Sequence, residues 1–169
     1  NNNDRILIPN ATSPRNIGDQ ASLMMLLRIL RKRYPAGNIT MHAHDVRMHQ
    51  RSKTSADTIK AHLYAWAVFI NKNPIIRTWR LVKLAVAYAA ARFGIFNTAK
   101  KYPVGSLGDL VKDYMRADLI VFTNGGYLRS QKGITQSLNL LMQISHFAFA
   151  KLTSAKKIVA PISFGPFGY

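Results

Sequence analysis

The sequence predicts an α/β domain with a Rossmann-like, mainly parallel sheet and helices on both of its faces. Short apolar runs recur along the chain, such as ILI at 6–8 and LIVF at 119–122. Continuous apolar runs are typical of strands that are buried on both faces of a parallel sheet. Longer segments with apolar residues at helical spacing separate these runs, and this alternation favours the α/β class.

Four segments are expected to form the strands of one sheet. The first reaches Pro9, and the second alternates, with Ile39, Met41 and Ala43 on one face. The last two are apolar runs that enter glycine-containing turns. The predicted strands span residues 5–10, 38–44, 117–123 and 157–163.

Five helices are expected between and beside these strands. Asp19 is well placed as the N-cap of the first, because its carboxylate can accept hydrogen bonds from the amides of the first turn. Pro35 and Gly37 end that helix. Ser106 begins a short helix, with Asp109 three residues later in a weak version of the capping box. The remaining helices are expected at about 55–70, 74–96 and 134–152.

The expected helix at 74–96 has the clearest pattern in the chain. Six apolar residues step by three and four along one stripe, and four basic residues fall on the opposite side. The stripe contains Ile75, Trp79, Val82, Val86, Ala89 and Phe93, and the basic side contains Arg77, Arg80, Lys83 and Arg92. If the stripe packs on the sheet, the basic side is left to contact solvent, an anionic membrane or another polyanion.

The charge of the chain is strongly unbalanced. It has 24 lysines and arginines against 7 acids, all of them aspartate, and a formal net charge of +17. Such a surface should attract polyanions, including nucleic acid and anionic lipid head groups. The absence of cysteine excludes disulfides and cysteine nucleophiles. No apolar run is long enough to span a bilayer, so we expect a cytoplasmic protein, with a peripheral position at the inner face of the membrane as an option.

Three segments together resemble the polysaccharide pyruvyl transferase family. They are NIGDQA at 16–21, ADLIVFTNGGYL at 117–128 and KKIVAPISFGPFG at 156–168, and their order and separations also fit. Members of this family are similar to two-domain GT-B glycosyltransferases. They transfer the carboxyvinyl unit of phosphoenolpyruvate to two hydroxyls of a sugar in a cell-surface polysaccharide or its lipid-linked precursor.

The resemblance implies that residues 1–169 form one Rossmann-like domain, the N-terminal half of a longer two-domain protein. The basic stretch 47–101 matches no motif of the family and is expected to be a helical insert. The residues that hold phosphoenolpyruvate lie mainly in the other half in this family. The resemblance therefore assigns no catalytic residue here, implies no cofactor beyond phosphoenolpyruvate as the donor substrate, and leads us to expect that this fragment alone is inactive.

The candidate substrate-binding residues lie in three turns that follow predicted strands. Ligands of open parallel sheets gather beyond the carboxyl ends of the strands, so the fold should bring these turns together. Their glycines could simply shape tight turns, but the convergence of three turns favours a ligand site. Asp19 would repel a phosphate there, which favours a neutral sugar hydroxyl. The candidates are Asn16, Gly18, Asp19, Asn124, Gly125, Gly126, Gly165 and Pro166.

Two other classes of function stay open at this point. A GT-B glycosyltransferase that uses a nucleotide sugar would share the architecture, and a non-enzymatic polyanion-binding module would explain the charge. The chain has no phosphate-loop motif and no dinucleotide fingerprint after its first strand. His42 and His44 share a strand face that could suit a metal, but no third ligand stands in an obvious motif, so we predict no metal site. His146 is expected to be a packed or surface histidine.

Overall fold

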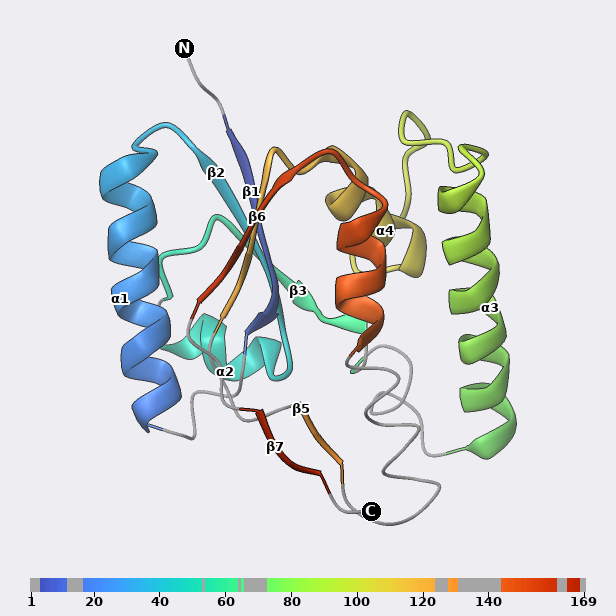
Figure 1. Ribbon diagram of the computed structural model, residues 1–169, viewed down its shortest axis with the longest axis horizontal. Coiled ribbons are helices and arrows are strands. Elements are labelled where there is room, and N and C mark those ends of the chain that lie inside the picture. The colour runs from blue at the N-terminus through green and yellow to red at the C-terminus, as the bar shows by residue number, and fades with distance from the viewer. Residues whose placement is uncertain are drawn as a thin grey trace.

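A five-stranded, entirely parallel sheet forms the centre of the domain (Figure 1), which confirms the predicted fold class. The computed structural model describes residues 4–11, 17–52, 54–63, 65, 73–123, 128–130, 144–160 and 164–167. The strand order is β3-β2-β1-β4-β6. These strands are β1 (Arg5–Ala11), β2 (Asn38–Ala43), β3 (Thr58–Ala61), β4 (Leu119–Phe122) and β6 (Lys156–Val159).

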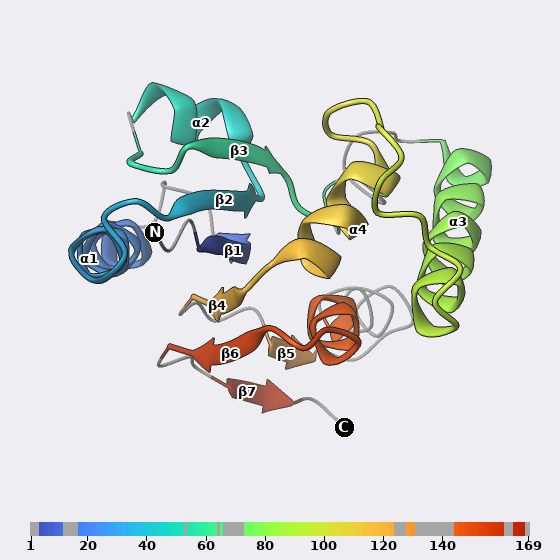
Figure 2. The same cartoon turned by 90° about the horizontal axis from the view of Figure 1, so that it is seen from above.

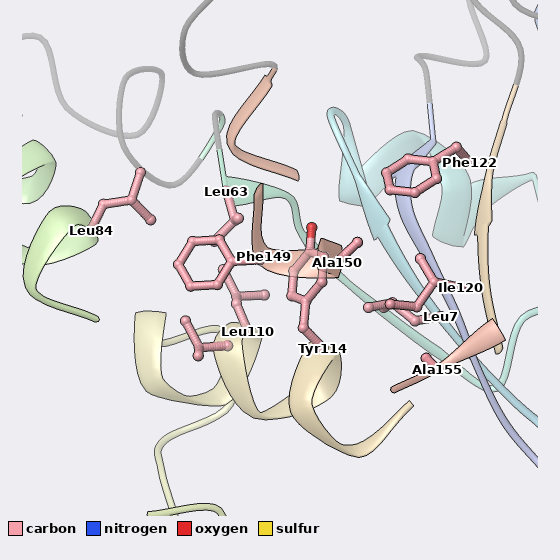
Figure 3. Close-up of a cluster of buried hydrophobic side chains, with 11 residues drawn as sticks. Leu7, Leu63, Leu84, Leu110, Tyr114, Ile120, Phe122, Phe149, Ala150 and Ala155 are labelled. Carbon is pink, nitrogen blue, oxygen red and sulfur yellow. The ribbon is translucent and has the colours of Figure 1, made fainter. Parts of the chain in front are cut away.

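The alternating side chains of the central strands pack into two separate apolar clusters. On one face, Ile6 and Ile8 of β1 pack with Leu23 and Leu27 of α1 (Ile17–Arg33). On the other face, Leu7 packs with residues of α4 (Leu107–Arg116), the helix at 144–151 and the C-terminal part of β4 (Figure 3). Burial on both faces explains why these strands read as continuous apolar runs.

The helix α1 begins earlier than the capping pattern predicted. Its first residue is Ile17, so Asp19 lies inside the first turn and is not the N-cap. From this position the negative carboxylate still interacts favourably with the positive end of the helix dipole. By contrast, the predicted start of α4 is correct, because Ser106 Oγ accepts a hydrogen bond of 3.1 Å from the Asp109 amide. Asp109 in turn accepts from the amide of Gly105, at 3.0 Å.

The helix expected at 55–70 is wrong over at least its first part. Residues 58–61 form β3, which pairs in parallel with β2. The carboxylate of Asp57 fixes this pairing, because it accepts a hydrogen bond of 2.6 Å from the Ile39 amide. A short helix, α2 (Val46–Arg51), precedes the strand. The stretch 47–101 therefore contributes a strand to the sheet and is not helical throughout.

The predicted pairing of the third and fourth expected strands in one sheet is confirmed by β4 and β6. The chain after β6 departs from the prediction, because β7 (Phe164–Phe167) pairs with β5 (Leu128–Ser130) in a second, two-stranded sheet. This small sheet lies beyond the carboxyl ends of the main strands (Figure 1). Of the helix expected at 134–152, residues 144–151 are helical and 134–143 lie outside the described residues.

The helix α3 (Pro74–Arg92) stands at the rim of the molecule, on the far side from α1 (Figure 2). Asn73 caps it, with Oδ1 accepting a hydrogen bond of 2.9 Å from the Ile75 amide. After the helix, Gly94 has a φ of +69°, a left-handed conformation that favours glycine. None of the helices that the structure describes is long and apolar enough to cross a membrane.

The sequence left open which face of α3 is buried, and the structure shows which one it is. Leu84 is buried, and Leu81, Ala87, Tyr88 and Ala91 are partly buried against the cluster of α4 and the 144–151 helix. The apolar stripe does not pack on the sheet and faces outward. The physical reason is that α3 packs on other helices through a face of leucine, alanine and tyrosine side chains and does not lie on the sheet.

Candidate functional site at the carboxyl edge of the sheet

The structure places part of the predicted substrate-binding set at the carboxyl side of the sheet. Gly18 is exposed and Asp19 is half-buried in the first turn of α1. The backbone of Gly165 and Pro166 belongs to β7. The N-terminus of α1 and the small sheet β5-β7 both lie on the side to which the main strands run (Figure 1). Asn16, Asn124, Gly125 and Gly126 lie outside the described residues.

Two buried polar residues link the carboxyl ends of β1 and β4, the strands that precede the first two predicted turns. Asn10 near the end of β1 and Thr123 just after β4 are 6% and 1% exposed. Asn10 Oδ1 accepts from the Thr123 amide at 3.2 Å, and Thr123 Oγ1 donates to the Asn10 carbonyl at 3.2 Å. These hydrogen bonds link the last part of β1 to the residue that follows β4. The chain segments that follow the two strands therefore start close together.

The strand order creates a switch point at the same place. Within the sheet, β2 and β3 lie on one side of β1, and β4 and β6, which come later in the chain, lie on its other side. Farther along the chain, α1 and the 144–151 helix pack in the two different apolar clusters. Open α/β sheets bind ligands outside the carboxyl ends of the strands at such a switch point. Neither Asn10 nor Thr123 was among the predicted site residues, because their pairing depends on the strand order.

A second polar cluster lies on the α4 side of β2 and β3, and sequence reasoning did not find it. Lys60 on β3 reaches Asp109 and Asp113 on α4, with 2.8 Å from Nζ to a carboxylate oxygen of each. Asp113 also lies 2.8 Å from Nε2 of His42 on β2. The side chains of His42 and Lys60 are 0% and 8% exposed, so these contacts are shielded from water.

Opposing influences set the charge of Asp113. Burial disfavours its ionised form, but the hydrogen bonds and charges of His42 and Lys60 outweigh burial and lower its pKa. Because an ionised carboxylate can only accept hydrogen bonds, Nε2 of His42 carries the proton in this contact. Within the described part of the chain, Nδ1 of His42 is a buried side-chain nitrogen without a hydrogen-bond partner.

A row of aromatic and imidazole rings lies next to the contact between His42 and Asp113. The Tyr114 hydroxyl lies 2.7 Å from Nδ1 of His146. The rings of His146 and His62 are 5.5 Å apart between centroids, and those of His62 and His44 are 5.1 Å apart. All three of these histidine pKa values are below the ordinary value, with burial as the main cause.

The inner part of the row, Tyr114, His146 and His62, is therefore buried and neutral at neutral pH, whereas His44 at its end is exposed. Burial lowers the pKa of His146 to about 3, and burial together with the neighbouring imidazoles lowers that of His62. Burial also raises the pKa of Tyr114 well above its ordinary value. Groups in this state are poor general bases near pH 7, so the row contributes to packing and to acid sensitivity.

No metal centre is formed by the histidines and acids in the described ranges. These residues contain no group of three or more His, Cys, Asp or Glu side chains placed to hold a metal ion. The pattern HAHD put His42 and His44 on one strand face, but the structure ends β2 at Ala43, before His44. His42 contacts Asp113 on α4, whereas His44 contacts the ring of His62.

A pocket of about 300 Å³ opens at the opposite, amino edge of β1 and β2. Its polar lining comes from Arg5, Asn38, Thr40, Asp113 and Arg116. Arg5 is held there by a two-pronged contact with Asp118, with nitrogen–oxygen distances of 3.0 and 2.8 Å. This edge is not where parallel sheets usually bind substrates, and it contains none of the predicted site residues.

The four predicted basic contact residues of α3 divide into two pairs. Lys83 and Arg92 are exposed, whereas Arg77 and Arg80 are half-buried on the side that faces the domain. Lys83 Nζ lies 5.4 Å from the centroid of the Trp79 ring, within cation–π distance. The apolar stripe and not the basic side is thus the outermost surface of the helix.

Comparison of the chain with models of protein families, with curated proteins and with solved structures found no match. The fold and the geometry of its strand ends therefore carry the functional interpretation.

Proposed function

We propose that this chain is the acceptor-binding half of a polysaccharide pyruvyl transferase. Such an enzyme joins the carboxyvinyl carbon of phosphoenolpyruvate to two hydroxyls of one sugar, releases phosphate and leaves a cyclic pyruvate ketal. One observation carries the proposal: the segments NIGDQA and NGG follow β1 and β4 closely, and these two strands are neighbours in the sheet.

The pair Asn10 and Thr123 supports this assignment. Their hydrogen bonds, at 3.2 Å each, hold the ends of β1 and β4 in one fixed register. Two turns that depart from fixed, adjacent points can present backbone groups to one ligand with little loss of conformational freedom. A sugar that spans both turns would have its hydroxyls fixed relative to the donor.

The described residues suit an acceptor site better than a donor site. Asp19 lies in the first turn of α1, where a carboxylate opposes binding of a phosphate and is compatible with neutral hydroxyls. Each hydroxyl must lose a proton, so a general base is required. His62 and His146 do not meet this need, because burial lowers their pKa values. We therefore assign the base and the basic donor site to the other half of the enzyme.

We further propose that the enzyme works at the cytoplasmic face of the membrane on a lipid-linked saccharide. The net charge of +17 supports a position next to anionic lipid.

The test is ketal formation by the protein that contains this chain together with a second Rossmann-like half. The protein is incubated with phosphoenolpyruvate and candidate saccharides, and the ketal methyl group is detected by NMR. Thr123→Val removes the bond from Oγ1 to the Asn10 carbonyl and should lower kcat/KM for the acceptor by about tenfold. Thr153→Val is the matched control, since it removes a 3.0 Å bond to the Ala150 carbonyl at the amino edge of the sheet.

Three outcomes would contradict the proposal in different ways. Binding of a nucleotide sugar without binding of phosphoenolpyruvate would favour a glycosyltransferase. Ketal formation by these 169 residues alone would contradict the division of roles between two halves. Equal loss of activity in the Thr123 and Thr153 variants would show that the β1–β4 edge has no special role.

A further inference from the structure

The outer face of α3 is an exposed apolar surface. Five large side chains lie on it in a continuous line along the helix, and each is between 45% and 77% exposed. They are Ile75, Trp79, Val82, Val86 and Phe93, called the outer stripe below. Exposed apolar residues are normal one at a time, but a contiguous line of them marks an interaction surface.

The opposite face of α3 already holds the helix on the domain. Leu84 is buried there, and the Tyr88 ring packs edge-to-face on Phe149 at 5.5 Å between centroids. In both views the helix forms the rim of the molecule, beyond α4 and the 144–151 helix (Figures 1 and 2). The outer stripe is therefore not needed to attach α3, and it points away from the sheet.

The charge around the outer stripe favours an anionic partner. Residues 58–108 contain eight lysines and arginines and no acidic residue. Lys83 and Arg92 are exposed beside the stripe, and Lys83 folds over the Trp79 ring. A second copy of the chain would bring two molecules of charge +17 together, so association between copies is opposed by repulsion.

We propose that the outer stripe of α3 inserts into the surface of an anionic lipid bilayer. An anionic membrane provides both features that the helix requires, an apolar layer for the stripe and negative head groups for the flanking cations. Trp79 sits at the level of the head groups, as tryptophan does at membrane interfaces. Lys83 and Arg92 extend past the apolar residues to the lipid phosphates. This binding does not depend on the proposed transferase activity.

The expected effects separate the apolar contribution from the charged one. Trp79→Ser with Phe93→Ser removes two large apolar groups and should lower partitioning into anionic vesicles by about tenfold or more. Lys83→Gln with Arg92→Gln should lower it by roughly 25-fold, since each cation near anionic lipid contributes about fivefold. The charge variant should matter only when the vesicles carry negative lipid.

The helix α1 supplies matched controls on the far side of the domain. Met25 and Ile29 are each 57% exposed, and Arg28 and Lys32 are exposed beside them. Met25→Ser with Ile29→Ser removes similar exposed apolar groups, and Arg28→Gln with Lys32→Gln removes the same number of charges. If α3 is the membrane contact, neither α1 variant should change partitioning by more than about twofold, because salt screens charges that lie far from the bilayer.

Vesicle co-sedimentation measures these affinities, with phosphatidylcholine vesicles prepared with and without phosphatidylglycerol. A direct readout comes from a Trp66→Phe background, in which Trp79 is the sole tryptophan of the chain. Its emission should shift to shorter wavelength on binding and be quenched by brominated acyl chains. Circular dichroism confirms that each variant is folded.

Two results would overturn the inference. One is equal binding of the α3 and α1 variants to anionic vesicles, with no shift in Trp79 emission. The other is a concentration-dependent dimer, seen by light scattering, that Trp79→Ser with Phe93→Ser converts to a monomer while vesicle binding stays absent. The stripe would then be an interface between copies of the chain.

Discussion

Replacing His146 with asparagine should make the stability of this domain less sensitive to mild acid. His146 is 4% exposed, and its Nδ1 lies 2.7 Å from the Tyr114 hydroxyl. Asparagine places an amide group near the position of Nδ1, so it can keep a hydrogen bond to the phenol. It cannot titrate, so the substitution removes the ionisable group while it preserves the contact.

The sign and size of the effect follow from the shifted pKa. Burial lowers the pKa of His146 from 6.5 to about 3 in the folded protein. Between these values the unfolded chain binds more protons than the folded one, so stability falls as the pH drops through this window. From pH 7 to pH 5 the loss from this residue is about 2 kcal/mol. His62, whose pKa is also lowered, adds to the loss in the same direction.

Urea unfolding, followed by circular dichroism at several values between pH 7 and pH 5, measures this difference. The parent should lose about 2 kcal/mol more than His146→Asn over that range. Tyr114→Phe is the contrasting variant, because it leaves the imidazole buried without the phenol. It should cost about 1–3 kcal/mol at every pH and leave the slope unchanged. Identical pH slopes for the parent and His146→Asn would refute the assignment of a neutral, buried imidazole.

Substitutions at three further positions test the contacts that hold α4 in place, each by denaturant unfolding at neutral pH. Lys60→Met leaves Asp109 and Asp113 without their shared cation and should lower the free energy of unfolding by about 3–5 kcal/mol. A decrease below about 1 kcal/mol would mean that water screens the contact. Leu110→Ala empties a site that is 0% exposed and should cost about 2–5 kcal/mol, and a smaller cost would indicate that the core collapses around it. Ser106→Ala removes the N-cap and should cost about 1 kcal/mol, while Ser106→Gly should cost only a few tenths.

The parts of the fold that depend on local sequence could be predicted. LIVF at 119–122 forms a strand because burial on both faces accepts an apolar residue at every position. Ser106 caps α4 because its hydroxyl reaches the amide three residues on, a contact that needs no other part of the chain. Asp19 shows the limit of such patterns, since Ile17 already begins the helix and places the carboxylate inside the first turn.

The orientation of α3 could not be predicted, because the helix has two faces that are both able to pack. The outer stripe carries the larger side chains, so periodicity alone assigns it to the core. The opposite face has Leu81, Leu84 and Tyr88 together with Ala87 and Ala91, and it packs against α4 and the 144–151 helix. Which face is buried depends on the surface that the helix meets, and that surface is formed by residues 15 or more positions away along the chain.

The polar contacts of the site depend even more strongly on the fold. Asn10 and Thr123 are 113 residues apart, and His42 and Asp113 are 71 apart. No spacing rule links such pairs, and they meet only because β1 lies between β2 and β4 in the sheet. The predicted turns were easier to find, since glycines after apolar runs mark strand ends directly in the sequence.

The proposed membrane-binding face of α3 and the proposed acceptor site are arranged so that membrane binding could favour acceptor binding. The N-terminal end of α3, with Ile75 and Trp79, points to the same side of the molecule as the carboxyl ends of the strands (Figure 1). A bilayer bound along α3 would therefore extend to the side of the domain on which the carboxyl ends of β1 and β4 lie. A saccharide on a lipid carrier could reach these strand ends without leaving the membrane surface. Partitioning then raises the local concentration of acceptor, so the Trp79 and Phe93 variants should raise KM for a lipid-linked acceptor and leave KM for a soluble saccharide unchanged.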